Sequence, residues 1–440
     1  MSLPHRPRRS QIVALLSASS ATSMANMAQT TVLGLVVYRL TDSELDLGIL
    51  GLAEFAPAAL LVFVAGAVVD RFDLRTIAAL GAATNAAVAV ALSLYLRHPH
   101  HLRVAPILLL VLAFGIGQAF LSPAERAIPA AMAPPEHVPL LVAQRNVAGE
   151  AAMILGPVLG GFLFAAGAWV PLAVVAGLSA IGAGATLFIR LAPAAPAPAP
   201  EAQTDLRSLR DEEVSHVLEE GIPPSGGSWR EAMAGLGFVR RHPILLGAIS
   251  LDLFAVLLGG AVTLLPAIAV RLHTGAIGLG WLRAATGIGA GSMTLFLSFR
   301  PVRRRVGRVL LAVVAIFGVW TIVLGITRSY AVAFVAILAL SAADAVSMFI
   351  RSTLVPLATP ADMRGRVLAV ENVFIGASNQ LGGFESGLAG QFLGTTGSVV
   401  LGGIGTLVVA LVWGVLFAPL RRLDTFPAPP PHSELAPPDP

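Results

Sequence analysis

Long apolar segments separated by short polar loops make up most of the chain. Twelve of these segments have the length of a membrane-spanning helix, which needs about 20 mainly apolar residues. The pattern therefore predicts an all-α integral membrane protein with twelve transmembrane helices. The expected spans lie near residues 11 to 37, 47 to 69, 76 to 96, 104 to 124, 138 to 166, 170 to 190, 243 to 270, 276 to 298, 308 to 327, 330 to 350, 366 to 393 and 398 to 419.

One long polar segment divides the spans into two groups of six. It contains "APAAPAPAPEAQ", which is Pro/Ala-rich and extended, and the acidic "RDEEVSHVLEE", which is expected to form a short surface helix. The predicted units are an N-terminal six-helix half (1–190), a cytoplasmic linker (191–242), a C-terminal six-helix half (243–420) and a Pro-rich cytoplasmic tail (421–440).

The two halves also resemble each other in sequence. The stretch "RAIPAAMAPPEHVPLLVAQRN" from Arg126 is similar to "RSTLVPLATPADMRGRVLAVEN" from Arg351. With one inserted residue the correspondence continues, so that Asn146 pairs with Asn372, Gly156 with Gly382 and Gly161 with Gly387. Such parallel, pseudo-symmetric halves are typical of transporters whose substrate site lies between the halves, near the bilayer midplane.

Arginine positions predict the orientation in the membrane. Twelve spans place both ends on one side, and most loop arginines fall on that side, which is therefore predicted to be cytoplasmic. The first apolar run continues without a clear cleavage site, so it is expected to be retained as the first span. The loops on the opposite side hold only Arg39, Arg97, Arg103, Arg271 and Arg328.

Composition narrows the possible functions. The chain is 56% hydrophobic and 12% charged, and its net charge of +4 comes from dispersed arginines that form no basic patch for nucleic acid. There is no cysteine, and the histidines lack metal-ligand spacing. Nucleotide-binding and hydrolase motifs are also absent from the sequence. We therefore expect no enzyme, no metal, no cofactor and no nucleic-acid partner.

A charged turn between the second and third spans reads "AGAVVDRFDLRT". Its Gly66 allows another helix to approach closely, and Asp70 lies at the carbonyl end of its own helix, where an acid is unfavourable unless it has a partner elsewhere. The alternative to such a contact with another helix is that the stretch is an ordinary charged loop.

A second motif, in the fifth span, is "GPVLGG", with Gly156, Pro157, Gly160 and Gly161. Its small residues permit close helix packing, and its proline bends the helix.

These motifs resemble those of the major facilitator superfamily, and most closely its drug and siderophore exporter branch, which includes enterobactin and macrolide exporters. The family signature G-x-x-x-D-R-x-G-R-R is matched by Gly66, Asp70, Arg71 and Arg75, whereas Asp73 and Leu74 depart from it. The resemblance implies the twelve-helix major facilitator fold and a gate in which this cluster latches the halves while the transporter faces outward. It also implies that "GPVLGG" is an antiporter motif, although generic close packing would explain the same residues.

Ionisable residues inside the spans are candidates for proton coupling, because each costs at least about 2.5 to 3.5 kcal/mol at the bilayer centre on insertion scales. The alternative is that they are structural acids neutralised by arginine, such as Glu150 by Arg145 or Asp344 by Arg351. A buried carboxylate can take up and release a proton as access alternates. The candidates are Glu54, Asp252, Glu150 and Glu385.

Arginines and neutral polar residues complete the predicted site. Arg126 and Arg351, which the repeat relates, are expected to have a structural role between the halves, while Arg283 is the better candidate for binding substrate or a carboxylate. In the family, the first, fourth, seventh and tenth spans line the cavity. This implies that the cavity wall includes Asn26, Gln29, Gln118 and Phe254, although helix-to-helix hydrogen bonds would explain the polar ones equally well.

The predicted function is secondary active transport: a proton-coupled exporter of amphipathic or hydrophobic small molecules, such as drugs or siderophores, working by alternating access. A lipid or lysolipid flippase, or a proton-coupled importer, is the alternative with the same fold. A sensor, a scaffold or a membrane enzyme is disfavoured, because no soluble domain or catalytic motif is visible. The expected partners are a small-molecule substrate, protons and the lipid bilayer. We expect a monomer in the bacterial cytoplasmic (inner) membrane, multi-pass, with both termini cytoplasmic.

Overall fold

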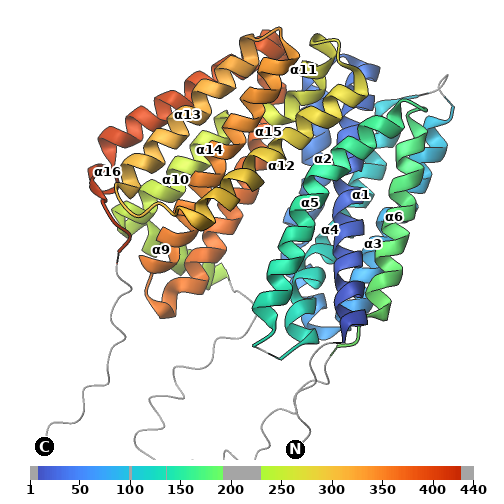
Figure 1. Ribbon diagram of the computed structural model, residues 1–440, viewed down its shortest axis with the longest axis horizontal. Helices are drawn as coiled ribbons and strands as arrows, with labels where there is room; N and C mark the ends of the chain where they lie inside the picture. The colour runs from blue at the N-terminus through green and yellow to red at the C-terminus, as the bar shows by residue number, and fades with distance from the viewer. Residues whose placement is uncertain (1–7, 99–101, 135, 192–228, 428–440) are drawn as a thin grey trace, which may run out of the picture.

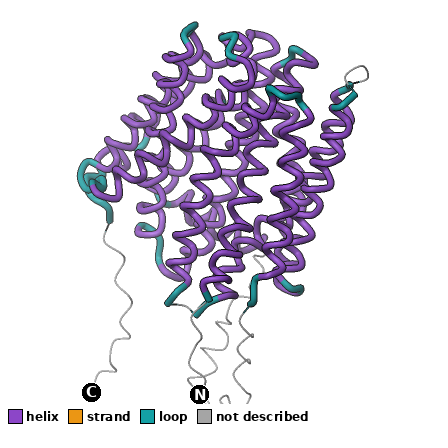
Figure 2. Tube along the Cα trace, turned by 45° about the vertical axis from the view of Figure 1, so that its right-hand side comes forward, coloured by secondary structure: helices purple, strands orange, loops and turns teal. Residues whose placement is uncertain are grey.

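A computed structural model describes residues 8–98, 102–134, 136–191 and 229–427. Within these ranges the chain is almost entirely helical and has no strand (Figure 2). Most of the predicted linker, including the acidic stretch expected to form a surface helix, lies outside the described residues.

Six helices form the N-terminal half, on the right of Figure 1. They begin and end close to the predicted spans, and short polar turns separate them. Asp42 ends the first helix in a left-handed conformation, and Ser43 and Asp73 cap the second and third through side-chain hydrogen bonds. The helices are α1 (Arg9–Thr41), α2 (Glu44–Arg71), α3 (Leu74–Leu96), α4 (Val104–Met132), α5 (Val138–Phe164) and α6 (Trp169–Phe188).

The C-terminal half is less regular. The seventh predicted span is interrupted at Gly259 and Gly260. Gly260 approaches a neighbouring helix so closely that a Cβ there would collide with the carbonyl oxygen of Gly382. The last two predicted spans belong to one long helix, in which Gly394 adopts a non-helical conformation (φ 70°, ψ 166°) that glycine tolerates readily. The elements are α9 (Trp229–Arg241), α10 (Pro243–Leu258), η2 (Ala261–Leu264), α11 (Leu265–Arg271), α12 (Gly275–Phe299), α13 (Val306–Ile326), α14 (Tyr330–Leu357), α15 (Ala361–Leu416) and α16 (Ala418–Arg422).

The helices are long and apolar enough for a membrane protein. Among the described residues, nine segments have the length and composition to cross a bilayer, with α10 to α11 counted as one and most of α15 as one. Helices α1 and α12, with 33 and 25 residues, are also long enough to cross a bilayer, and Gly394 divides α15 into two parts. The arrangement fits the predicted major facilitator fold.

The end of the predicted linker is helical and packs with the C-terminal half. Val239 of α9 is buried in a cluster with Leu245 and Ile249 of α10 and with Val355 and Val367 of the following helices. The sequence pattern did not indicate this element, because α9 has only 13 residues, too few to span a membrane.

The two halves meet at one end of the molecule and separate toward the other (Figure 1). At the closed end, Leu35 and Leu47 of the N-terminal half share an apolar cluster with Leu264, Ile268 and Leu282 of the C-terminal half. At the opposite end, where α1 begins and α6 ends, no atom lies within 4 Å of the positions that a Cβ would occupy at Gly66 of α2 and Gly365 of α15. The predicted orientation makes the open end cytoplasmic.

Glycines from the repeated motif form the closed seam between the halves. Gly156 lies against Met24 and Ala28 of α1, whereas Gly161 lies against Ala276 and Gly280 of α12. Their repeat counterparts also make one contact within their half and one with the other half: Gly382 contacts α10, and Gly387 contacts Glu44 and Gly48 of α2. The repeat seen in the sequence is therefore a repeat of helix contacts, and half of these contacts join the two halves.

Replacing Gly161 with valine is expected to open this seam, because even a Cβ there would lie 2.5 Å from the carbonyl oxygen of Ala276. Overpacking costs about 1 to 3 kcal/mol, which corresponds to a population shift of about 5- to 150-fold. Since the chain has no cysteine, a single Leu47→Cys reporter can measure the opening by its labelling with an impermeant maleimide. Gly149→Val in the same helix, where the space is open, should leave labelling unchanged; equal labelling in both variants would contradict this role of the seam.

Candidate functional site

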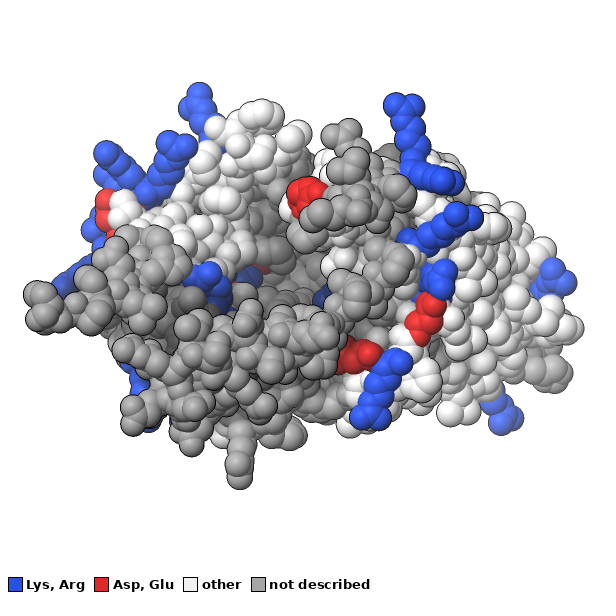
Figure 3. Space-filling model, turned by 90° about the horizontal axis from the view of Figure 1, so that it is seen from below, with Lys and Arg blue, Asp and Glu red and all other residues white. Residues whose placement is uncertain are grey.

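A hollow between the halves opens at the end where they separate. Figure 3 shows the molecule from this end, with charged side chains around the opening and a few within it. The halves pack against each other through two pairs of helices, α2 with α15 and α5 with α12. The predicted site residues can be placed relative to this hollow.

Glu54 and Arg283 are a predicted acid and a predicted arginine from opposite halves that lie in electrostatic range of each other, although no N–O contact within 4 Å joins them in the described structure. The carboxyl group of Glu54 on α2 accepts a hydrogen bond from the Thr30 hydroxyl on α1 and interacts electrostatically with Arg283 of α12. Arg283 also lies beside Gly34, and its Nε is buried without a hydrogen-bond partner in the described structure. Opposite charges on the two halves inside the membrane can respond both to a proton and to a charged ligand.

Two further predicted acids are less enclosed. Glu150 of α5 is exposed, and its Oε2 lies 4.0 Å from the Cβ position at Gly291 of α12, so it faces the opposite half. Glu385 of α15 is half-buried and accepts a hydrogen bond of 3.5 Å from the hydroxyl of Ser386. Neither has an ion-pair partner among the described side chains.

The predicted cavity-wall residues differ in their surroundings. Gln29 is 1% exposed, and its Oε1, like Oδ1 of Asn26, has no hydrogen-bond partner in the part of the chain that the structure describes. Gln118 is half-buried on α4. Phe254 packs its ring 5.3 Å from that of Trp413 in the last part of α15, a contact within the C-terminal half.

Asp252 belongs to a charged cluster buried inside the C-terminal half. Its Oδ1 lies 2.8 Å from an Arg351 nitrogen, and a second Arg351 nitrogen lies 3.8 Å from Glu371. All three side chains are at most 8% exposed. The cluster joins α10, α14 and α15, and Glu371 is a member that sequence reasoning missed, because it lies near the polar start of its span.

The N-terminal half has a related cluster. Glu125 of α4 accepts a hydrogen bond of 2.9 Å from Thr22 of α1 and lies 3.8 Å from Arg145 of α5. The repeat places Arg145 opposite Glu371, so both clusters join the first, fourth and fifth helices of their half with acid and base exchanged. Sequence reasoning also missed Glu125, although its position next to Arg126, the partner of Arg351 in the repeat, was a usable signal.

The two repeat-related arginines were expected to act between the halves, and for Arg351 the structure contradicts this. Its ion pairs with Asp252 and Glu371 lie entirely within the C-terminal half. Arg126 is exposed on α4. The repeat therefore has an arginine at both positions, but in the N-terminal half the buried residue is the neighbouring Glu125 and not Arg126.

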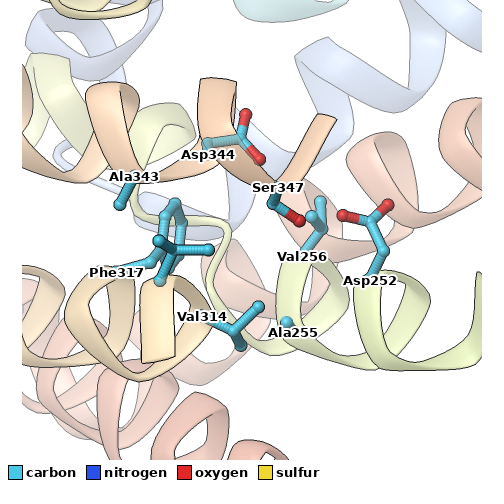
Figure 4. A pocket seen from close by; sticks show the side chains of 9 residues that line it. Asp252, Ala255, Val256, Val314, Phe317, Ala343, Asp344 and Ser347 are labelled. Carbon is cyan, nitrogen blue, oxygen red and sulfur yellow. The ribbon is translucent and has the colours of Figure 1, made fainter. Parts of the chain in front are cut away.

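A small cavity is lined in part by Asp252 of the C-terminal cluster (Figure 4). Its volume is about 10 Å³, and its lining combines Asp252, Asp344 and Ser347 with apolar side chains of α10 and α13. Asp344 stands at the middle of α14 and interacts electrostatically with both Asp252 and Arg351. It was expected only as a partner of Arg351.

The charged turn between α2 and α3 is open in this conformation. Asp70 and Arg71 are exposed. Asp73, which departs from the family signature, caps α3 and pairs with Arg75 at 2.6 Å. The hydrogen bond from Arg75 holds the pKa of Asp73 at about 2, so this pair is lost only as the pH falls from about 4 toward that value.

Replacing Asp70 with asparagine is expected to slow transport without destabilising the protein in this conformation. An exposed substitution changes stability by about 0.5 kcal/mol or less, whereas the proposed latch forms only when this end closes. The measurement compares turnover with the midpoint of thermal unfolding in detergent. The control is Asp73→Asn, which keeps the helix cap; an unchanged turnover for the Asp70 variant would reject the latch.

Two bundles of helices related by an internal repeat, with buried charges at their interface and a hollow open at one end, define a membrane transporter. The sequence profile of the Major Facilitator Superfamily matches residues 15–383, and the chain belongs to this family. It is therefore a transporter and not an enzyme, and members of the family carry small-molecule substrates.

Individual relatives agree with this assignment. The chain is 26% identical over 395 residues to the enterobactin exporter EntS of Citrobacter koseri, covering 86% of this chain and 83% of the relative. Its fold is similar to that of a bacterial homologue of the human lysosomal transporter Spinster in an inward-facing, unoccupied conformation (TM-score 0.67, 15% identity, 94% and 97% of the two chains). It is also similar to a D-xylose–proton symporter (TM-score 0.65, 17% identity, 94% and 98%). These structures include transporters of different substrates, so they establish the fold alone.

Proposed function

We propose that the protein is a proton-coupled exporter of amphipathic small molecules, working by alternating access in the bacterial inner membrane with both termini in the cytoplasm. The observation that carries this proposal is the electrostatic interaction of Glu54 with Arg283, which brings a titratable group of one half into range of a fixed positive charge on the other. The similarity to an enterobactin exporter supports the direction of transport and a siderophore-like substrate.

The open end of the hollow supports entry of substrate from the cytoplasm. In the predicted orientation the structure faces inward, with the glycine seams closed on the outer side. A substrate entering the hollow would meet Glu54 and Arg283 near its closed end. Both side chains lie on helices that form the seam, so a change in their interaction acts on the contacts that hold the outer side shut.

A proton and a substrate would compete for this pair. When Glu54 is ionised, a state that the charge of Arg283 favours, its carboxylate can accept hydrogen bonds from a donor or cationic group of the substrate, and when Glu54 is protonated this acceptor is lost. Arginine cannot lose its own proton under these conditions, so Glu54 is the only one of the two that titrates. In the outward-facing state a proton from water would bind Glu54 and displace the substrate, and after the return to the inward-facing state Glu54 would release that proton to the cytoplasm.

An efflux test in cells checks the proposed direction and substrate class. Cells expressing or lacking the protein are loaded with amphipathic fluorescent dyes or with enterobactin, and the remaining cellular content is followed with and without a protonophore. We expect faster, protonophore-sensitive loss from expressing cells. Protonophore-sensitive accumulation instead of loss would identify an importer, and redistribution of a labelled lysolipid without loss of any dye would identify a flippase; either result would contradict export.

A further inference from the structure

The C-terminal half contains more buried acid than its arginine neutralises. Arg351 pairs with Asp252 and Glu371, and Asp344 lies in electrostatic range of both Asp252 and Arg351. If all three acids were ionised, three negative charges would surround one positive charge inside the membrane. Each such charge costs at least about 2.5 to 3.5 kcal/mol on insertion scales, so the cluster favours binding of a positive species.

The N-terminal half shows that the excess acid is not needed to join the helices. There one carboxyl group, Glu125, one arginine, Arg145, and the hydroxyl of Thr22 connect the same three helices of the repeat. That cluster is balanced in charge. The repeat places Ala119 where the C-terminal half has Asp344, so Asp344 is an addition without a structural counterpart.

Ser347 provides a second, independent indication of a bound species. Its side chain is 3% exposed, and its Oγ has no hydrogen-bond partner within the described ranges. Figure 4 shows Ser347 between the carboxyl groups of Asp344 and Asp252, with its hydroxyl on the side of Asp252. The cavity that these three residues line has a volume of about 10 Å³, close to what one water molecule needs.

Asp344 is the member of the cluster best suited to hold a proton. Asp252 and Glu371 have ion pairs with Arg351, which stabilise their ionised forms, whereas Asp344 has no ion pair within 4 Å among the described residues. Asp344 faces a second carboxyl group, that of Asp252, and Arg351 is in electrostatic range of both. Helix α13 contributes only Val313, Val314 and Phe317 to the cavity, and Arg283 of α12 has Glu54 as its electrostatic partner.

We propose that Asp344 is a second proton-binding site, in the C-terminal half, whose carboxylic acid is linked through the Ser347 hydroxyl and one water molecule to Asp252. The proton comes from water as the O–H bond of the acid forms and returns to water as that bond breaks, with no change of oxidation state. The use of this proton in export rests on the proposed function, but its binding does not.

Infrared difference spectroscopy of the purified full-length protein tests the proposal without any substrate. Spectra recorded in acidic and neutral buffer show the C=O band of a protonated carboxylic acid. Carbon-13 labelling of aspartate shifts such a band for Asp344 and leaves the bands of Glu54 and Glu371 in place. We expect an aspartate-sensitive band that titrates, that disappears in Asp344→Asn and that is retained in Glu54→Gln.

The Ser347→Ala variant keeps every charge and is expected to move the frequency of this band, since it removes a hydrogen bond to the acid network. If Asp344→Asn cannot be purified, the labelled wild-type protein and Ser347→Ala still decide the question. An acid band that is insensitive to aspartate labelling, or one that persists in Asp344→Asn, would overturn the proposal. So would a band that responds to replacing choline with sodium at constant pH, which would show that the cavity takes a metal cation. Loss of export with an unchanged band would count only against the transport function.

Discussion

Replacing Arg351 with methionine is expected to lower the free energy of unfolding by about 3 to 5 kcal/mol, the usual cost of leaving a buried charge without its partner. The guanidinium group is 4% exposed and pairs with Asp252 and Glu371. Without it, both acids face each other and Asp344 in a membrane interior, and they must take up protons to remain buried. Unfolding in detergent, followed by circular dichroism, measures the loss.

The repeat offers a matched control for this variant. Arg126 occupies the corresponding position in the N-terminal half but is exposed, so Arg126→Met should change stability by about 0.5 kcal/mol or less. Adding Asp252→Asn to Arg351→Met should restore part of the loss, since it removes one of the unpaired acids. Equal effects at the two arginines would show that the C-terminal cluster does not hold its helices together.

Replacing Glu54 with glutamine is expected to abolish the pH-driven component of transport while leaving the protein folded. Glutamine has nearly the same shape and can still accept the hydrogen bond from Thr30, but it cannot exchange a proton or neutralise Arg283. Export against a concentration gradient should stop, whereas exchange of labelled for unlabelled substrate, which needs no net proton movement, should continue. Uptake and exchange in proteoliposomes separate the two activities.

Two control variants separate the loss of the titratable group at Glu54 from other effects of substitution. Glu54→Asp keeps the titration and should retain pH-driven transport at a lower rate, because the shorter side chain reaches Arg283 less well. Glu150→Gln removes an exposed acid beside the same hollow and should keep most of the activity. If Glu54→Gln retained full pH dependence, the coupling proton would have to be carried elsewhere, and Asp344 would become the first candidate.

The sequence was sufficient for the architecture, because membrane spans and their repeat follow from simple patterns. Apolar length predicted the helices, and the matched glycines at Gly156 and Gly382 predicted a repeat that the structure shows as equivalent helix contacts. Interruptions such as the break after α10 were not predicted, since an apolar run continues through Gly259 and Gly260 regardless of backbone conformation.

The site was predicted less completely, because pairing across helices is not visible in a linear pattern. Single acids such as Glu54 and Asp252 stood out within apolar spans. Glu125 and Glu371 did not, since they lie near polar span ends, and only the fold brings them to Arg145 and Arg351. The role of Asp73 was also hidden: as a departure from the family signature it weakened the motif, yet in the structure it caps α3 and holds Arg75.

Proton movement during transport is the most direct test of the account. The purified protein is reconstituted into liposomes that contain a pH-sensitive dye, and the compound exported in the cell test is added on one side without an imposed pH gradient. A proton-coupled antiporter must move protons opposite to the substrate, so the side that receives the substrate should become more alkaline, and Glu54→Gln should abolish the signal. Substrate movement with no pH change, or with protons moving in the same direction, would contradict proton-coupled export.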